Sequence, residues 1–155
     1  MISLALSISC SLFLKTIFDL FSRSAEGGYA EAQNMLGVMY YRGTVVPQDY
    51  TKALAWGIIA SDKGYAPSQA NIASMYEEGK GTYKDMNKAA ELYKLAAEQG
   101  HAGAQYCLGG LYFTGEGVEK NYETAFMWIE KAAEQGHVKA QYILGSMYDE
   151  GKDVK

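Results

Sequence analysis

The sequence predicts an all-α fold, an α/α solenoid of stacked antiparallel helix pairs. The first observation is a fixed period of 36 residues between four glycines, Gly28, Gly64, Gly100 and Gly136. The second is composition, because helix formers dominate whereas the 155 residues include only two prolines. A period in the range of roughly 20 to 50 residues indicates supersecondary units that bury their apolar faces only by stacking on one another.

The first half of each unit predicts an amphipathic helix, which we call helix A. Small and apolar residues recur there at helical spacing. They are Ala32, Leu36, Gly37, Met39 and Tyr40; Ile72, Ala73, Met75 and Tyr76; Ala104, Leu108, Gly109, Leu111 and Tyr112; and Ala140, Leu144, Gly145, Met147 and Tyr148. A glycine inside a helix costs about 0.5 to 1 kcal/mol relative to alanine. Gly37, Gly109 and Gly145 therefore predict close approach of a neighbouring helix.

The second half of each unit predicts another amphipathic helix, helix B, after a short loop that contains glycine. Its apolar positions are Tyr50, Ala53, Leu54, Trp56, Ile59 and Ala60; Met86, Ala89, Ala90, Leu92, Tyr93 and Ala96; and Tyr122, Ala125, Phe126, Trp128, Ile129 and Ala132. Two alanines seven residues apart lie on one side of a helix. We expect these alanine pairs to face the small residue of helix A.

The register divides the chain into complete and partial repeats. Residues 29–64, 65–100 and 101–136 form three complete repeats. Residues 17–28 match the helix B of a preceding repeat, and residues 137–155 match the helix A of a fourth. Both ends fall within a repeat, which predicts either a fragment of a longer solenoid or an array capped in an unusual way.

Residues 1–16 form a separate apolar N-terminal segment, and its first 14 residues carry no charged side chain. The segment is interpreted as a signal-like sequence, a short membrane anchor or a helix packed over the first unit. No basic residue precedes the apolar run, and the run is shorter than the roughly 18 to 20 residues of a spanning helix. The sequence favours a packed helix and a cytoplasmic location. Export, envelope association or membrane contact requires residues 1–14 to act as a signal or anchor.

The stretch from Ala97 to Tyr112 reads AEQGHAGAQYCLGGLY, and this pattern resembles the Sel1-like repeat family. The resemblance extends from about Ile17 to Gly151. Tetratricopeptide repeats share the Leu-Gly-x-x-Tyr start and the paired alanines but usually have a period of about 34 residues. The resemblance implies a right-handed, tetratricopeptide-like superhelix with helix A on its concave surface, and a role as a scaffold or adaptor.

The sequence offers no set of residues for catalysis, for a metal or for a cofactor. His101 and His137 lie one repeat apart without Cys or acidic partners at ligand spacing, so we interpret them as corner residues that pack on helix A. Cys10 and Cys107 have no sequence reason to pair, and Cys107 has no evident activating base. We therefore expect a protein that is not an enzyme.

Some cysteine-rich members of the Sel1-like family are associated with β-lactams, which defines an alternative function. The alternative is an envelope or secreted protein that binds or hydrolyses β-lactams. Neither Ser-x-x-Lys nor Lys-Thr-Gly, two serine signatures of β-lactam enzymes, occurs in the sequence. The paired cysteines of that subgroup are absent as well, so the scaffold interpretation is preferred.

The variable surface of helix A is the candidate binding surface, because residues beside the Leu-Gly-x-x-Tyr core are predicted to point outward. The candidate partner-binding residues are Asn34, Val38, Tyr41, Arg42, Ser74, Glu77, Tyr106, Phe113, Tyr142 and Asp149. Aromatic anchors beside carboxylates favour a protein or peptide with apolar and basic residues. Nucleic acid is excluded as a partner, because the net charge is -4 and no run of Lys or Arg occurs. Alternatively, Tyr41, Tyr106 and Phe113 pack between adjacent A helices.

Overall fold

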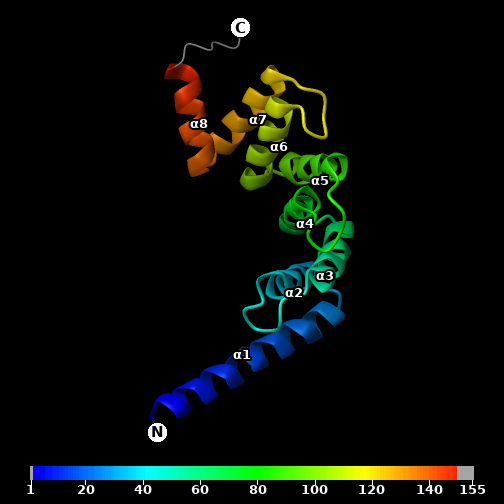
Figure 1. The fold of residues 1–155 in the computed structure, drawn as a ribbon, viewed down its shortest axis with the longest axis vertical. Coiled ribbons are helices and arrows are strands. Elements are labelled where there is room, and N and C mark those ends of the chain that lie inside the picture. Colours follow the sequence, from blue (N-terminus) through cyan, green and yellow to red (C-terminus); the bar gives the residue numbers. More distant parts are fainter. Residues whose placement is uncertain (1, 150–155) are drawn as a thin grey trace. The chain divides into compact units, whose positions relative to one another are not determined.

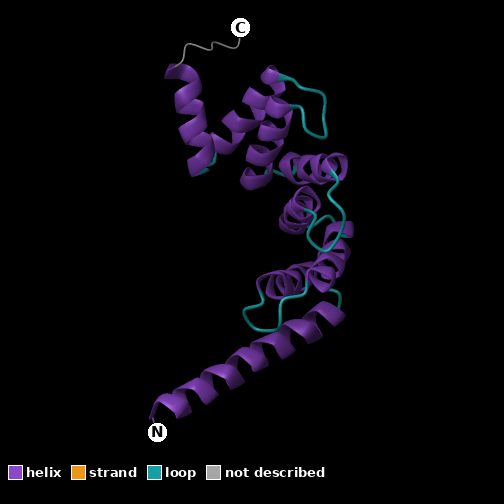
Figure 2. Ribbon diagram, in the orientation of Figure 1, coloured by secondary structure: helices purple, strands orange, loops and turns teal. Residues whose placement is uncertain are grey.

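The computed structural model describes the backbone of residues 2–149 and the side chains of residues 12–146. In this part of the chain, helices joined by loops are the only regular structure (Figure 1; Figure 2). The helices are α1 (Ile2–Glu26), α2 (Ala30–Arg42), α3 (Tyr50–Asp62), α4 (Ala66–Glu78), α5 (Met86–Glu98), α6 (Ala102–Thr114), α7 (Tyr122–Glu134) and α8 (Val138–Asp149). The even-numbered helices are A helices, and α3, α5 and α7 are B helices. The predicted all-α fold is confirmed.

The chain divides into two compact units, Met1–Tyr65 and Ala66–Lys155, which we call unit 1 and unit 2. Unit 1 contains α1, α2 and α3, and α1 runs through residue 16 without a break. Its core consists of Ala25, Ala32, Leu36 and Met39, with Ile17, Phe18, Phe21, Val45, Val46 and Trp56 packed around them. The last turns of α1 therefore pack on α2, as a helix B packs on the next helix A.

Helix α1 keeps several large apolar side chains exposed. Leu12, Phe13 and Leu20 are each more than 60% exposed, the last of them on the turn that also contributes Phe18 and Phe21 to the core. No helix among the described residues combines the length and the hydropathy that crossing a membrane requires.

Unit 2 contains α4 to α8, in which each helix contacts the next along the chain. At its C-terminal end the core consists of Ile129, Ala132, Ala133 and Ala140, with Tyr106, Ile143 and Leu144 packed around them. Alanines dominate the interior of the B helices, and Ala89, Ala96, Ala125 and Ala132 are completely buried. Small side chains at these positions allow the helices to approach one another closely.

The start of each B helix is stabilised by a polar side chain. Asp49, Asp85 and Asn121 accept the backbone N–H of the third residue that follows, at 3.0, 2.9 and 2.8 Å. These bonds satisfy donors that a helix leaves free at its N-terminus.

Two of the A helices end at a glycine. Helix α2 ends at Gly43 and helix α6 ends at Gly115, and their φ angles of 65° and 80° favour glycine.

The glycines inside helix A permit the close approach that the sequence predicts. A Cβ atom added to Gly37 would lie 3.1 Å from the carbonyl oxygen of Ala53. One added to Gly109 would lie 3.0 Å from the carbonyl oxygen of Ala125 and 2.6 Å from Ile129 Cγ1. Among the described residues, no atom lies within 4 Å of a Cβ added to Gly145, which belongs to α8, the last described helix. The close approach at Gly145 therefore stays a prediction.

A row of buried glutamines joins consecutive helices within unit 2. Gln105 donates through Nε2 to the carbonyl oxygen of Ala97 at 3.1 Å. Its own Oε1 accepts from Nε2 of Gln135 at 2.7 Å, and Gln69 accepts from Gln99 in the same way. The amides are thereby satisfied in an interior where an unpaired polar group is costly.

Unit 1 breaks this pattern, because Lys63 occupies the position that Gln99 occupies one repeat later. Gln33 donates through Nε2 to the carbonyl oxygen of Ala25 at 3.0 Å. Lys63 donates to the carbonyl oxygen of Gly28 instead of approaching the glutamine. As a result, Oε1 of Gln33 is buried and has no hydrogen-bond partner among the described residues.

We expect Gly109→Ala to lower the free energy of unfolding by about 1 to 3 kcal/mol, because the added Cβ collides with Ile129 and the Ala125 carbonyl. Gly110→Ala is the matched control, since no atom lies within 4 Å of an added Cβ there. It should raise stability by up to about 1 kcal/mol through helix propensity. Urea unfolding monitored by circular dichroism measures both. Equal stability of the two variants would contradict the close approach.

We expect Lys63→Gln to raise the free energy of unfolding by about 1 kcal/mol, because its amide would satisfy the buried Oε1 of Gln33. The reverse change, Gln99→Lys, should lower it by about 1 to 3 kcal/mol by leaving Oε1 of Gln69 unpaired. Denaturant titrations of both variants and the wild type provide the comparison. A loss of stability in Lys63→Gln would refute the proposed pairing.

Candidate partner-binding surface

In unit 2, the surface formed by α4, α6 and α8 is hollowed into two adjacent cavities. The first has a volume of about 630 Å³, and its lining includes Asn71, Ser74, His101, Tyr106, His137 and Lys139. We call it the basic cavity, because its lining residues include no Asp or Glu. The second has a volume of about 290 Å³, and its lining includes Glu77, Leu111, Thr114, Glu116, Ile129 and Ile143. We call it the acidic cavity. Tyr106 and Cys107 line both.

Two histidines of the basic cavity cap helices as well as line the cavity. Nδ1 of His101 accepts the backbone N–H of Ala104 at 3.1 Å, and Nδ1 of His137 accepts that of Ala140 at 3.3 Å. A nitrogen that accepts carries no proton, so each neutral ring carries its proton on Nε2. The sequence predicted that these corner residues pack on helix A, and the structure adds a specific role at the start of α6 and α8.

The surroundings of His101 and His137 oppose protonation of His101. Burial lowers the pKa of His101, and the nearby His137 lowers it further. The ring of His137 stacks on Tyr106 at a centroid distance of 4.8 Å and an interplanar angle of 27°. Although they lie one repeat apart in the sequence, both histidines line one cavity.

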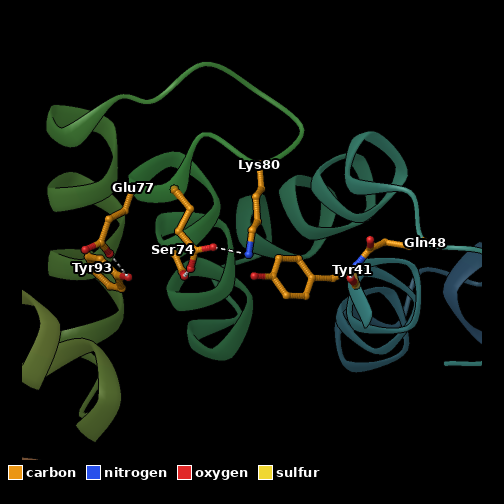
Figure 3. A network of polar contacts seen from close by, with 7 residues as sticks. Tyr41, Gln48, Ser74, Glu77, Lys80 and Tyr93 are labelled. Carbon is orange, nitrogen blue, oxygen red and sulfur yellow. Dashed lines mark hydrogen bonds and ion pairs between the residues drawn. The ribbon is translucent and has the colours of Figure 1, made fainter. Parts of the chain in front are cut away.

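A buried tyrosine connects the two cavities. The hydroxyl group of Tyr93 donates to Oε2 of Glu77 at 2.8 Å, and Figure 3 shows the two side chains pointing toward one another from α5 and α4. Burial raises the pKa of Tyr93, and it raises the pKa of Cys107, which is a free thiol. Cys107 is therefore protonated near neutral pH and is a poor nucleophile. Among the described residues, no three His, Cys, Asp or Glu side chains are placed to hold a metal ion.

Three of the candidate residues of unit 2 line these cavities, and Phe113 and Tyr142 do not. Ser74 lines the basic cavity, Glu77 lines the acidic cavity and Tyr106 lines both. Phe113 is 42% exposed and contacts the ring of Tyr122 edge-on at a centroid distance of 5.2 Å. Tyr142 in α8 is 79% exposed. Phe113 thus packs on the helix B of its own repeat but keeps much of its surface free for contact.

The candidate residues of unit 1 differ in their exposure. Arg42 is exposed, Val38 and Tyr41 are half-buried, and Asn34 is 8% exposed. The ring of Tyr41 contacts Tyr50 at a centroid distance of 5.3 Å, which is the repeat equivalent of the contact between Phe113 and Tyr122. The side chain of the remaining candidate, Asp149, lies outside the described residues.

Sequence reasoning missed several residues that line the cavities. From the sequence, the histidines are interpreted only as corner residues, and Glu116 is not singled out. Both histidines lie at the same repeat position, one residue after Gly100 and Gly136. The change from tyrosine to histidine at this position was the available signal, but only the three-dimensional structure, in which Tyr106 stacks on His137, shows that the two histidines line one cavity.

The fold defines an α-solenoid protein built from repeated helix pairs. A family model described as Sel1 repeat matches residues 30–65, 66–101, 102–137 and 138–155. The chain belongs to the Sel1 repeat family. A search of curated proteins finds no significant match.

Solved structures of similar proteins agree with this assignment. A protective antigen of uropathogenic Escherichia coli with a Sel1-like repeat fold is 43% identical, with a TM-score of 0.85 over 89% of this chain. A Sel1 repeat protein from Oxalobacter formigenes is 38% identical, with a TM-score of 0.78 over 83% of this chain. The matches span 30% and 51% of those two proteins. Cysteine-rich protein B of Helicobacter pylori, 23% identical with a TM-score of 0.69 over 86% of this chain and 96% of that one, shares the fold.

We expect His101→Asn to weaken the dependence of stability on pH. The folded-state pKa of His101 lies below the ordinary value of 6.5, so its contribution is present above pH 6.5 and is lost as pH falls through the folded pKa. Asparagine caps a helix without titrating, and a cap contributes about 0.5 to 2 kcal/mol. Urea unfolding of wild type and variant between pH 5 and 8 measures the effect. Parallel pH profiles would argue against the neutral cap.

Proposed function

We propose that this chain is a non-catalytic scaffold or adaptor that binds an extended peptide or protein segment on the surface of its A helices. Sel1 repeats commonly act as protein-interaction scaffolds and are generally non-catalytic. The observation that carries the proposal is the pair of adjacent cavities in unit 2, joined by Tyr106 and Cys107. Because the two cavities adjoin on one surface, an extended segment that lies across them would place different side chains in each.

The chemistry of the acidic cavity supports a partner with apolar and basic residues. Glu77 and Glu116 supply negative charge, while Leu111, Ile129 and Ile143 supply apolar surface. Lys and Arg have an apolar stem and a cationic head, so they match such a wall. Exposed aromatic rings at Phe113 and Tyr142 add contact area that loses little side-chain entropy on binding. In unit 1 we assign Val38, Tyr41 and Arg42 of α2 to the same function.

The alternative function, binding or hydrolysis of β-lactams, has no supporting observation in the described residues. Covalent attack requires an activated nucleophile with an adjacent base. Cys107 is the thiol that lines the cavities, and burial keeps it protonated. The scaffold function therefore remains the proposal.

We expect the double substitution Tyr106→Ala and Phe113→Ala to reduce binding of peptides selected on the full chain by tenfold or more, because both aromatic anchors are lost. Peptides enriched by phage display on the full wild-type chain serve as probes, and fluorescence anisotropy measures their affinity. Tyr83→Ala is the matched control, since Tyr83 is 94% exposed and lines neither cavity.

Circular dichroism and thermal unfolding establish whether the double variant retains its fold. Undiminished binding by a folded double variant would refute the proposed surface. Collapse of the fold would instead support the alternative in which these aromatic residues serve packing. The single variant Phe113→Ala then tests the surface, because Phe113 is 42% exposed.

A further inference from the structure

We propose that the segment bound by unit 2 carries a carboxylate and a basic side chain about two residues apart. The carboxylate occupies the basic cavity and the Lys or Arg side chain occupies the acidic cavity. This inference rests on the proposed function and adds the charge pattern of the ligand. It is argued from the opposite charges of two neighbouring cavities on one surface.

The basic cavity presents hydrogen-bond donors and no competing carboxylate. Lys139 lines it with an exposed ammonium group. His101 and His137 also line it, and their Nδ1 atoms are committed to the helix caps, so their remaining ring donors are the Nε2–H groups. The N-terminal turn of α8, which begins at Val138, adds the partial positive charge of a helix start. These groups together favour a carboxylate.

The acidic cavity has the opposite character. Glu77 and Glu116 are its charged lining residues, and no Lys or Arg is among them. The hydrogen bond from Tyr93 uses Oε2 of Glu77 and orients the carboxylate. Thr114 adds a hydroxyl group beside apolar walls. A Lys or Arg side chain would pair its cation with these acids and bury its stem against the apolar residues.

The helix α6 sets the distance between the two positions because it lines both cavities. Its contribution to the basic cavity spans residues 103–107, and its contribution to the acidic cavity spans residues 106–114. The midpoints of these spans, 105 and 110, lie five residues apart, or about 7.5 Å at about 1.5 Å per helical residue. An extended peptide advances about 3.3 Å per residue, and its side chains two residues apart lie on the same face. The carboxylate and the basic side chain are therefore about two residues apart in the ligand.

The test uses fluorescein-labelled peptides of about 12 residues with an Ala and Leu background and the full chain in solution at physiological ionic strength. Two peptides carry Glu and Arg two residues apart, one in each order. Three control peptides carry Glu and Glu, Arg and Arg, or Gln and Gln at the same positions. We expect one of the Glu and Arg peptides to bind at least tenfold tighter than every control, as measured by fluorescence anisotropy.

A charge-reversal variant identifies which cavity holds the carboxylate. Lys139→Glu should lower the affinity for the preferred peptide by at least tenfold and raise that for the Arg and Arg peptide. Lys84→Glu makes the same change in net charge on an exposed residue that lines neither cavity, and it should leave both affinities unchanged. Equal effects of the two variants would overturn the assignment, because they would show a general charge effect.

The outcomes separate this inference from the proposed function. If the Gln and Gln peptide binds as tightly as the Glu and Arg peptides, and Tyr106→Ala abolishes this binding, the surface binds peptides but the charge pattern is wrong. If no peptide binds, both the charge pattern and the peptide-binding function are overturned.

Discussion

The close approach of α3 to Gly37 and of α7 to Gly109, each within its own repeat, is the contact on which the rest of the fold depends. In the second repeat the buried Ala73 takes the position of these glycines. At Gly37 and Gly109 the partner backbone lies about 3 Å from where a Cβ would be. A side chain there would push the helices apart and displace the alanine-lined faces that pack between them. Because the contact recurs with the repeat, the loops and helix caps recur with it, and the surface of the A helices follows.

The side chains between each helix B and the next helix A differ from repeat to repeat, although the backbone there follows the same course. Tyr29 precedes α2 without capping it, whereas His101 and His137 cap α6 and α8 through Nδ1. Similarly, Gln99 satisfies a buried amide in unit 2, whereas Lys63 at the equivalent position leaves one unsatisfied in unit 1. The same repeat position therefore donates a hydrogen bond to a buried glutamine in one repeat and leaves the equivalent glutamine oxygen without a partner in another.

The surface of unit 2 shows how a structural repeat acquires binding chemistry. Burial keeps Tyr93 and Cys107 protonated, so the wall between the cavities is uncharged. Charged groups lie on either side of that wall, with Lys139 in one cavity and Glu77 and Glu116 in the other. Neutral groups at the centre avoid the cost of desolvating a charge when a ligand covers them. The charged groups that remain solvated can then distinguish one partner from another.

The sequence by itself determined the helical fold, the period of 36 residues and the pairing of glycine with alanine, because these depend on local spacing and on a contact that repeats along the chain. Only the tertiary structure decided that His101 and His137 share a cavity and that Asn34 is buried. These features depend on which side chains pack around each helix A, and the repeat position of a residue does not determine whether a neighbour covers it. The charges around the two cavities likewise come from α4, from α8 and from the loop after α6, so their arrangement became visible only when these elements were placed together.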